Sequence, residues 1–178
     1  IEYQNGSTSS YFFDEPYTYS TGQSLGNADN RFKGLITMRD ALIGSRNIPA
    51  VQAFQKVAAK DINKIADFVH SVGIDYGSTL YESASIGGFN GTNPLEMSAA
   101  YAVFGRSGYY IKPYSFTKVI YEDGTTYENK YTKEKVLSEE TSYMITSMLI
   151  DTVRDTWSGN IKINGTETTV YTHPSGTN

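Results

Sequence analysis

The amino-acid sequence predicts one domain of mixed α/β (α+β) structure, in which helices take up more of the chain than strands. Its 178 residues are the length of a single domain, large enough to bury a sizeable core. Several stretches place apolar residues at the three- and four-residue spacing of a helix face. Two others, 115–131 and 161–172, contain Asp-Gly or Asn-Gly within strand-like sequence, which is typical of β-hairpins.

Composition and charge exclude several classes of function. The formal net charge is −4, which gives no reason to expect a nucleic-acid partner. The chain has no cysteine, which excludes disulfides, thiolate chemistry and cysteine-based zinc sites. No run approaches the ~20 apolar residues of a membrane span. We expect no cofactor and no metal, because His70 has no second ligand residue at metal-binding spacing.

Residues 1–33 predict irregular but ordered structure. They are rich in Ser, Thr, Gly, Asn and Tyr and show few periodic apolar positions. Turn signals occur at Asp14-Glu15-Pro16 and at Ser20-Thr21-Gly22. The many aromatic residues before Ser20 argue against a disordered linker.

The stretch from Gly34 to Val57 predicts two short helices separated by a break. Thr37 is the expected N-cap of the first helix, with Asp40 as its capping-box partner. Pro49 suits only the first turn of a helix, so the second helix is expected to begin at Asn47 or Ile48. The break Ser45-Arg46-Asn47 would therefore present two short polar side chains from a rigid apolar base, as functional sites require.

Three further helices are predicted, at 61–73, 93–104 and 138–153. Asp61 and Gly73 bound the first, and Asn93 with Pro94 begins the second. Acidic residues after Ser138 favour the start of the third. The apolar stripes expected to be buried in the five helices are Met38, Ala41 and Leu42; Val51, Phe54, Val57 and Ala58; Ile62, Ile65, Val69 and Val72; Met97, Ala100, Tyr101 and Phe104; and Met144, Ile145, Met148, Leu149 and Val153.

Together these segments resemble the transpeptidase domain of class A penicillin-binding proteins, the bacterial enzymes that cross-link peptidoglycan. The similar segments are IEYQNG, FDEPYTYSTG, TMRDALIGSRNIPAVQAFQKVA, SIGGFNGTNPLEMSAAYAVFGRSGYYIKPYSFTKVIYEDG and SEETSYMITSMLIDTV, in the family's order. The resemblance implies an antiparallel sheet covered by helices, of which residues 1–178 would form a partial, mainly helical portion without a second domain. It also implies a location on the extracytoplasmic face of the membrane, with the membrane anchor in a missing N-terminal part of the protein.

The resemblance assigns roles to two sets of residues. Ser45 and Asn47 match the Ser-x-Asn motif, in which the Ser relays a proton and the Asn binds the substrate carbonyl. Ser175, Gly176 and Thr177 match the last three positions of the Lys-Thr/Ser-Gly-Thr motif, which binds substrate along a strand. Pro174 stands where the family has Lys, so that charge is missing here.

The family's nucleophile belongs to a Ser-x-x-Lys motif that precedes Ser-x-Asn. No such motif occurs between Ile1 and Ser45, so we expect the nucleophile to lie outside this chain. The implied partners are the D-Ala-D-Ala end of a peptidoglycan stem peptide, and β-lactams. We expect this chain alone to form no covalent β-lactam adduct.

Two alternatives remain open at this point. The first is a transpeptidase-like module that has lost its chemistry and binds peptidoglycan or partner proteins. The second is a different serine hydrolase that uses His70 or His173 as its base, although no G-x-S-x-G elbow supports it.

Overall fold

The structure is a computed structural model that describes residues 1–3, 5–156, 160–163 and 166–169. The helices are α1 (Met38–Ile43), α2 (Asn47–Asp61), α3 (Asn63–Ser71), the 3-10 helix η1 (Glu82–Ile86), α4 (Pro94–Gly105) and α5 (Glu139–Thr156). The strands are β1 (Tyr11–Asp14), β2 (Tyr17–Thr18), β3 (Ser24–Leu25), β4 (Gly34–Thr37), β5 (Tyr109–Ile111), β6 (Lys118–Ile120), β7 (Thr126–Glu128), β8 (Lys133–Lys135), β9 (Asn160–Ile163) and β10 (Thr166–Thr169).

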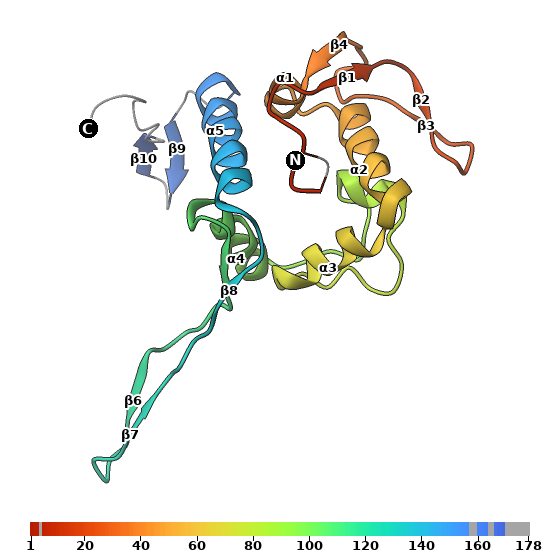
Figure 1. Ribbon diagram of the computed structural model, residues 1–178. Helices are drawn as coiled ribbons and strands as arrows, with labels where there is room; N and C mark the ends of the chain where they lie inside the picture. Colours follow the sequence, from red (N-terminus) through yellow and green to blue (C-terminus); the bar gives the residue numbers. More distant parts are fainter. Residues whose placement is uncertain (4, 157–159, 164–165, 170–178) are drawn as a thin grey trace.

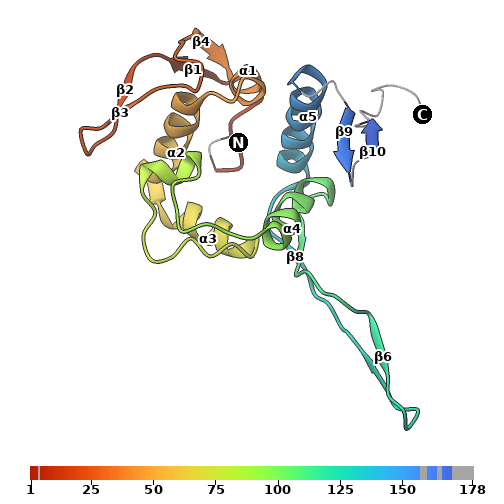
Figure 2. The ribbon, with the colours of Figure 1, turned by 180° about the vertical axis from the view of Figure 1, so that it is seen from behind.

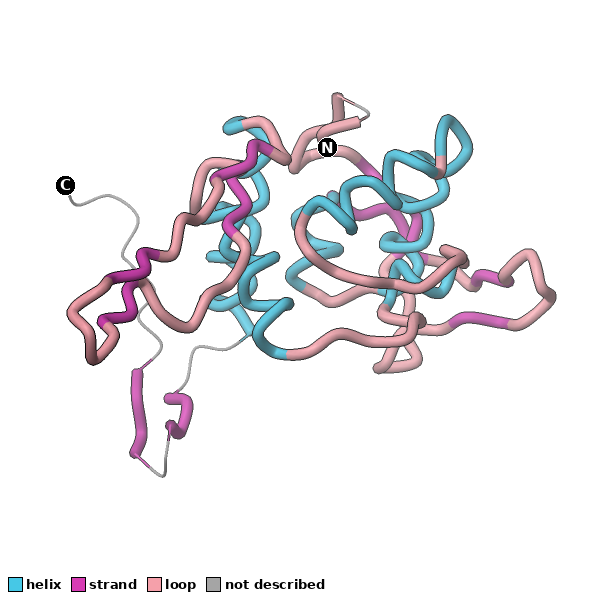
Figure 3. Tube along the Cα trace, turned by 90° about the horizontal axis from the view of Figure 1, so that it is seen from below, coloured by secondary structure: helices cyan, strands magenta, loops and turns pink. Residues whose placement is uncertain are grey.

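The α-helices form the body of the molecule and follow one another around its centre (Figure 1). Helix α1 packs on α2 and also on α5, which brings the first and last helices of the chain together. The view from behind shows the same order (Figure 2), and the view from below shows several strand pairs at the periphery (Figure 3). The hairpin β6–β7 extends away from the helices, while the N-terminus lies among them.

The described strands form two-stranded antiparallel pairs, and no described sheet has a third strand. Pairing of β1 with β4 sets Tyr11 opposite Thr37 and Asp14 opposite Gly34. The prediction of irregular structure for residues 1–33 was therefore wrong for β1, β2 and β3. Strand β1 has three aromatic residues of high β-propensity, but it is only four residues long and its partner β4 begins 20 residues after it ends, so the pairing was not apparent from the neighbouring sequence.

The local chemistry of the helix starts confirms the predicted caps. The backbone N–H of Asp40 donates to Thr37 Oγ1 at 3.1 Å, and that of Glu96 donates to Asn93 Oδ1 at 2.9 Å. Helix α2 begins at Asn47, so Pro49 lies in its first turn as expected. No described helix combines the length and the hydropathy that a membrane span requires.

The boundary between α2 and α3 differs from the prediction. Helix α2 continues to Asp61, whose carboxylate still accepts the backbone N–H of Asn63 at 3.0 Å. Asp61 therefore ends α2, and the N-cap position of α3 is Ile62, which makes no side-chain cap bond, so the prediction of Asp61 as the N-cap was wrong. Gly73 follows α3 with φ +78°, a conformation that favours glycine, and a Cβ there would collide with the Tyr110 side chain.

One apolar cluster joins α3, α4 and the segment before α5. Its buried members are Val72, Ala100, Val103 and Leu137. A second group of buried apolar residues lies next to the Ser45 turn: Phe12, Ala41, Ile48 and Val51. Most residues of the predicted stripes are buried or partly buried. Tyr101, Ile62 and Leu42 are 55%, 42% and 38% exposed, so their assignment to the core was wrong. The small residues Ala99, Ala100 and Val103 form the buried face of α4 instead.

Both predicted hairpins form. Strands β6 and β7 pair around a turn in which the backbone N–H of Thr125 donates to the Asp123 carboxylate at 2.9 Å. Strands β9 and β10 pair antiparallel, and Asn164-Gly165 between them lies outside the described residues.

Candidate functional site

The turn that carries Ser45 closes α1 by backbone hydrogen bonds. The N–H of Ser45 donates to the Leu42 carbonyl at 3.1 Å, and the N–H of Arg46 donates to the Ala41 carbonyl at 2.9 Å. This pair of bonds defines a Schellman ending, in which the residue at the position of Ser45 adopts a left-handed conformation and is usually glycine. Ser45 has φ +49°, which costs a non-glycine residue about 1–2 kcal/mol. Such strain is found where a side chain serves a function.

Arg46, between the two motif residues, points into the protein. Its Nε donates to Asp14 Oδ2 at 2.8 Å, and its Nη1 donates to Asp29 Oδ2 at 2.9 Å. A third hydrogen bond joins Nη2 to the Arg31 carbonyl. Burial lowers the pKa of the guanidinium, but the hydrogen bonds to Asp29 and Asp14 more than offset this and leave the pKa above its ordinary value. Arg46 therefore anchors the turn from below as a permanent cation.

Asn47 is held by its backbone and by its side chain. Its N–H donates to Asn27 Oδ1 at 2.9 Å, and its Nδ2 donates to the Gly26 carbonyl at 2.9 Å. Asn27 is itself buried and donates through Nδ2 to Asp14 Oδ1 at 2.7 Å. The same carboxylate therefore supports Arg46 directly and Asn47 through Asn27.

Ser45 and Asn47 line a cavity of about 430 Å³. Its other walls are largely apolar and come from α1, α2, η1 and α5, and Ile1 also contributes. The apolar lining residues are Ile1, Phe12, Met38, Ala41, Leu42, Pro49, Ala50, Ala53, Ile86 and Ile145. The polar lining residues are Ser45, Arg46, Asn47 and Ser85. A few polar side chains at the wall of an apolar cavity are typical of a binding site.

The described residues that line this cavity supply the hydroxyls of Ser45 and Ser85, the Asn47 carboxamide and the Arg46 guanidinium, but no base. No hydrogen bond to Ser45 Oγ from any described residue is present, and no described group of three His, Asp or Glu side chains could hold a metal. His70 is exposed and stacks on Tyr76, with ring centroids 4.6 Å apart, and it does not line the cavity. Acyl transfer at this cavity would therefore need a base that its described lining does not supply.

One Ser-x-x-Lys sequence does occur after the Ser45 turn, at Ser115 to Lys118. Lys118 begins strand β6, and both side chains are exposed in the projecting hairpin. A catalytic Ser-Lys pair needs its two side chains within hydrogen-bond reach, and no such bond joins these two. The hairpin therefore holds no Ser-Lys pair with the geometry of a catalytic pair.

The remaining predicted site residues, Ser175, Gly176 and Thr177, lie outside the described residues, as do Pro174 and His173. The structure therefore brings together Ser45 and Asn47 only. Reasoning from sequence missed Arg46, Asp14 and Asn27. Asp14 was interpreted as a turn residue, although Phe12 and Asp14 occupy the same face of β1 and are both buried. The alternation in Tyr11–Asp14 was the signal that could have identified it.

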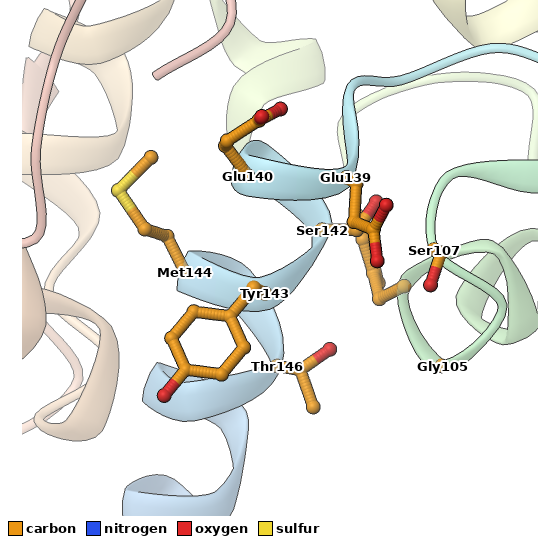
Figure 4. A pocket seen from close by; sticks show the side chains of 9 residues that line it. Gly105, Ser107, Glu139, Glu140, Ser142, Tyr143, Met144 and Thr146 are labelled. Atoms are coloured by element: carbon orange, nitrogen blue, oxygen red, sulfur yellow. The ribbon is translucent and has the colours of Figure 1, made fainter.

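A second cavity, of about 510 Å³, lies between α5 and the turn after α4 (Figure 4). Glu139, Ser142 and Thr146 from α5 line it together with Gly105 and Ser107. It shares no lining residue with the cavity at Ser45. The two sites are separate.

Comparison with known proteins identifies the family. The family model described as "Penicillin binding protein transpeptidase domain" matches residues 1–172. Penicillin-binding protein 1A/1B of Bacillus subtilis is 38% identical over 86% of this chain, and penicillin-binding protein 1A of Streptococcus pneumoniae is 36% identical over 80%. This chain spans only 17% and 20% of those two relatives.

Solved structures have the same fold. Penicillin-binding protein 1A from Haemophilus influenzae matches with a TM-score of 0.70 and 23% identity, over 89% of this chain and 29% of that one. The imipenem acyl-enzyme complex of penicillin-binding protein A from Mycobacterium tuberculosis matches with a TM-score of 0.73 and 14% identity, over 84% of this chain and 40% of that one. The chain thus belongs to the family of penicillin-binding protein transpeptidase domains.

Proposed function

We propose that this chain is the Ser-x-Asn portion of a serine-type D,D-transpeptidase that cross-links peptidoglycan stem peptides and is acylated by β-lactams. The observation that carries the proposal is the rigid presentation of Ser45 and Asn47 at the wall of one cavity, above the buried Asp14–Arg46 pair. The relatives that this chain matches are penicillin-binding proteins 1A/1B and 1A, and it spans 17% and 20% of their lengths. The acyl-enzyme complexes among the structural neighbours support the expectation of β-lactam binding.

The proposed reaction has two steps. A serine Oγ from another part of the protein attacks the carbonyl between the two D-Ala residues, the C–N bond breaks, and the terminal D-Ala leaves with a proton. An amine of a neighbouring stem peptide then attacks the resulting ester, which forms the cross-link and restores the serine hydroxyl. Ser45 would relay the proton to the leaving nitrogen, and Asn47 would donate an amide N–H to the substrate carbonyl.

We expect the nucleophilic serine and its lysine to lie at the cavity next to Ser45. Its walls are apolar apart from a few polar side chains, and Ile1 lies at its edge. A segment that precedes Ile1 in the longer protein would bring the nucleophile and its lysine next to Ser45. Ser175, Gly176 and Thr177 would bind the stem peptide along a strand. The protein would act at the extracytoplasmic face of the bacterial membrane.

A second candidate function is a degenerate transpeptidase module that binds peptidoglycan or a partner protein without chemistry. Pro174 in place of the family's Lys favours it, because proline supplies neither a charge nor an N–H. The two functions differ in one measurable property, which is acylation by a penicillin.

The test uses the full-length protein that contains this chain. Asn47→Ala should lower the rate of acylation by penicillin on the order of 10²–10³-fold, as when one positioned donor is removed. Asn129→Ala is the matched control, because Asn129 donates to the Phe116 carbonyl at 3.0 Å in the projecting hairpin. Acylation that is insensitive to Asn47→Ala would refute the assigned role, and no acylation of the unchanged protein would favour the degenerate module.

A further inference from the structure

Asn27 lies at the meeting point of the loop 26–33 and the Ser45 turn. Its side-chain oxygen accepts the backbone N–H of Asn47 at 2.9 Å. Its Nδ2 donates to Asp14 Oδ1 at 2.7 Å and to the Arg31 carbonyl at 2.9 Å. The residue is only 3% exposed, so each of its polar groups is engaged inside the protein.

The partners of Asn27 are themselves fixed. Asp14 is fully buried, and its second oxygen accepts hydrogen bonds from Arg46 Nε at 2.8 Å and from the backbone N–H of Lys33 at 3.1 Å. A carboxylate with this many donors cannot rotate without losing several hydrogen bonds at once. The orientation of the Asn27 carboxamide is therefore determined by groups that lie away from the cavity.

The loop 26–33 fixes the position of Asn47 by two hydrogen bonds. Asn27 holds the backbone N–H of Asn47, and the adjacent carbonyl of Gly26 accepts from Asn47 Nδ2 at 2.9 Å. One side-chain N–H and Oδ1 of Asn47 have no hydrogen-bond partner among the described residues, and Asn47 lines the cavity. The loop thus fixes one amide hydrogen and leaves the second for a ligand.

We propose that Asn27 is a positioning residue for the Ser-x-Asn motif: with the Gly26 carbonyl, it sets the direction of the amide N–H that Asn47 offers to substrate. This inference rests on the proposed function. Asn27 does not line the cavity, and its hydrogen bond to the motif is to Asn47. Misplacement of a binding group by about 1 Å lowers rates by about 10²-fold, which sets the scale of the effect.

The experiment measures the maximal acylation rate and the pre-acylation dissociation constant of a penicillin with the full-length protein. Asn27→Ala should lower the maximal rate by about 10–100-fold and change the dissociation constant far less. The double variant Asn27→Ala/Asn47→Ala should acylate as slowly as Asn47→Ala alone, since Asn27 acts through that residue. Asn129→Ala, the control, should leave both quantities unchanged.

If Asn27 only stabilised the fold, its replacement would not lower the acylation rate of the folded protein. Val103→Ala truncates a fully buried side chain of the α3–α4 cluster and lowers stability without touching the site. At a temperature where all variants are folded, Val103→Ala should keep the rate of the unchanged protein. An Asn27→Ala rate within about two-fold of the unchanged protein, or losses that multiply in the double variant, would overturn the inference.

A second variant covers the case in which Asn27→Ala does not fold. Asn27→Asp keeps an acceptor for the Asn47 N–H but places a carboxylate against Asp14, near Arg46 and Asp29. Protonation restores a donor toward Asp14, so its rate relative to the unchanged protein should rise as the pH is lowered. A ratio independent of pH would overturn the inference. Loss of rate in Asn47→Ala but not in the Asn27 variants overturns this inference alone, whereas no acylation of the unchanged protein overturns the proposed function with it.

Discussion

Arg46 Nε lies 2.8 Å from Asp14 Oδ2, and the two side chains are 4% and 0% exposed. The ion pair is therefore buried under the turn that carries Ser45 and Asn47. Arg46→Met would leave the Asp14 carboxylate buried without its cation. We expect a loss of about 3–5 kcal/mol in the free energy of unfolding, measured as a lower Tm of the transpeptidase domain.

A partly exposed ion pair of the same chemistry provides the control for that prediction. Arg39 pairs with Asp151 across α1 and α5, with side chains 30% and 26% exposed. Arg39→Met should cost about 1 kcal/mol or less, because solvent screens such pairs. Equal destabilisation by the two substitutions would contradict the anchoring role of Arg46.

Because the backbone of Ser45 is left-handed, we expect two substitutions of this residue to have similar effects on the acylation rate but different effects on stability. Ser45→Ala and Ser45→Gly both remove the hydroxyl, but only glycine adopts φ +49° without strain. Ser45→Gly should therefore be more stable than Ser45→Ala by up to about 1 kcal/mol, seen as a higher Tm. Both variants should acylate more slowly than the unchanged protein. Identical Tm values would show that the turn stores no strain at this residue.

Glu82 predicts a dependence of stability on pH. Hydrogen bonds lower the pKa of its carboxyl below the ordinary 4.5, chiefly the bond from the backbone N–H of Ser20 at 3.0 Å, although burial opposes the shift. A lowered folded-state pKa stabilises the protein above the unfolded value, and this contribution is lost as pH falls through the folded value.

Glu82→Gln removes that titration while keeping an acceptor for Ser20. The Tm of the unchanged protein should therefore fall more steeply between about pH 5 and pH 3 than the Tm of Glu82→Gln. Glu2, whose carboxyl pKa is also lowered because its burial is outweighed by its hydrogen bonds, chiefly to Ser138, is present in both proteins and cancels in the comparison. Parallel pH profiles would contradict the assignment to Glu82.

Sequence reasoning succeeded where neighbouring residues determine the structure. The caps at Thr37 and Asn93, the position of Pro49 in α2 and the turn at Asp123-Gly124 each depend on a few adjacent side chains. The Ser45 break was predicted for the same reason. Its role in catalysis rests on resemblance and stays a prediction.

The contacts of Arg46 with Asp14 and Asp29, which hold the Ser45 turn, could not be predicted from neighbouring residues. Arg46 lies 32 residues from Asp14 and 17 from Asp29, and an arginine in a turn between helices is ordinarily exposed. Asp14 is buried only because β1 pairs with β4, and that pairing brings together segments about 20 residues apart. Tyr101 was predicted to be buried but is exposed. Helical spacing alone does not determine which of two adjacent apolar faces packs inward.

We propose that Ser45 and Asn47 assist a serine nucleophile that precedes Ile1 in the longer protein. The most direct measurement is peptide mapping, by mass spectrometry, of the penicillin adduct formed by the full-length protein. We predict one penicilloyl group on a serine of a Ser-x-x-Lys motif preceding Ile1, formed much more slowly in Asn47→Ala. An adduct on a serine between Ile1 and Asn178, or no adduct at all, would contradict the account.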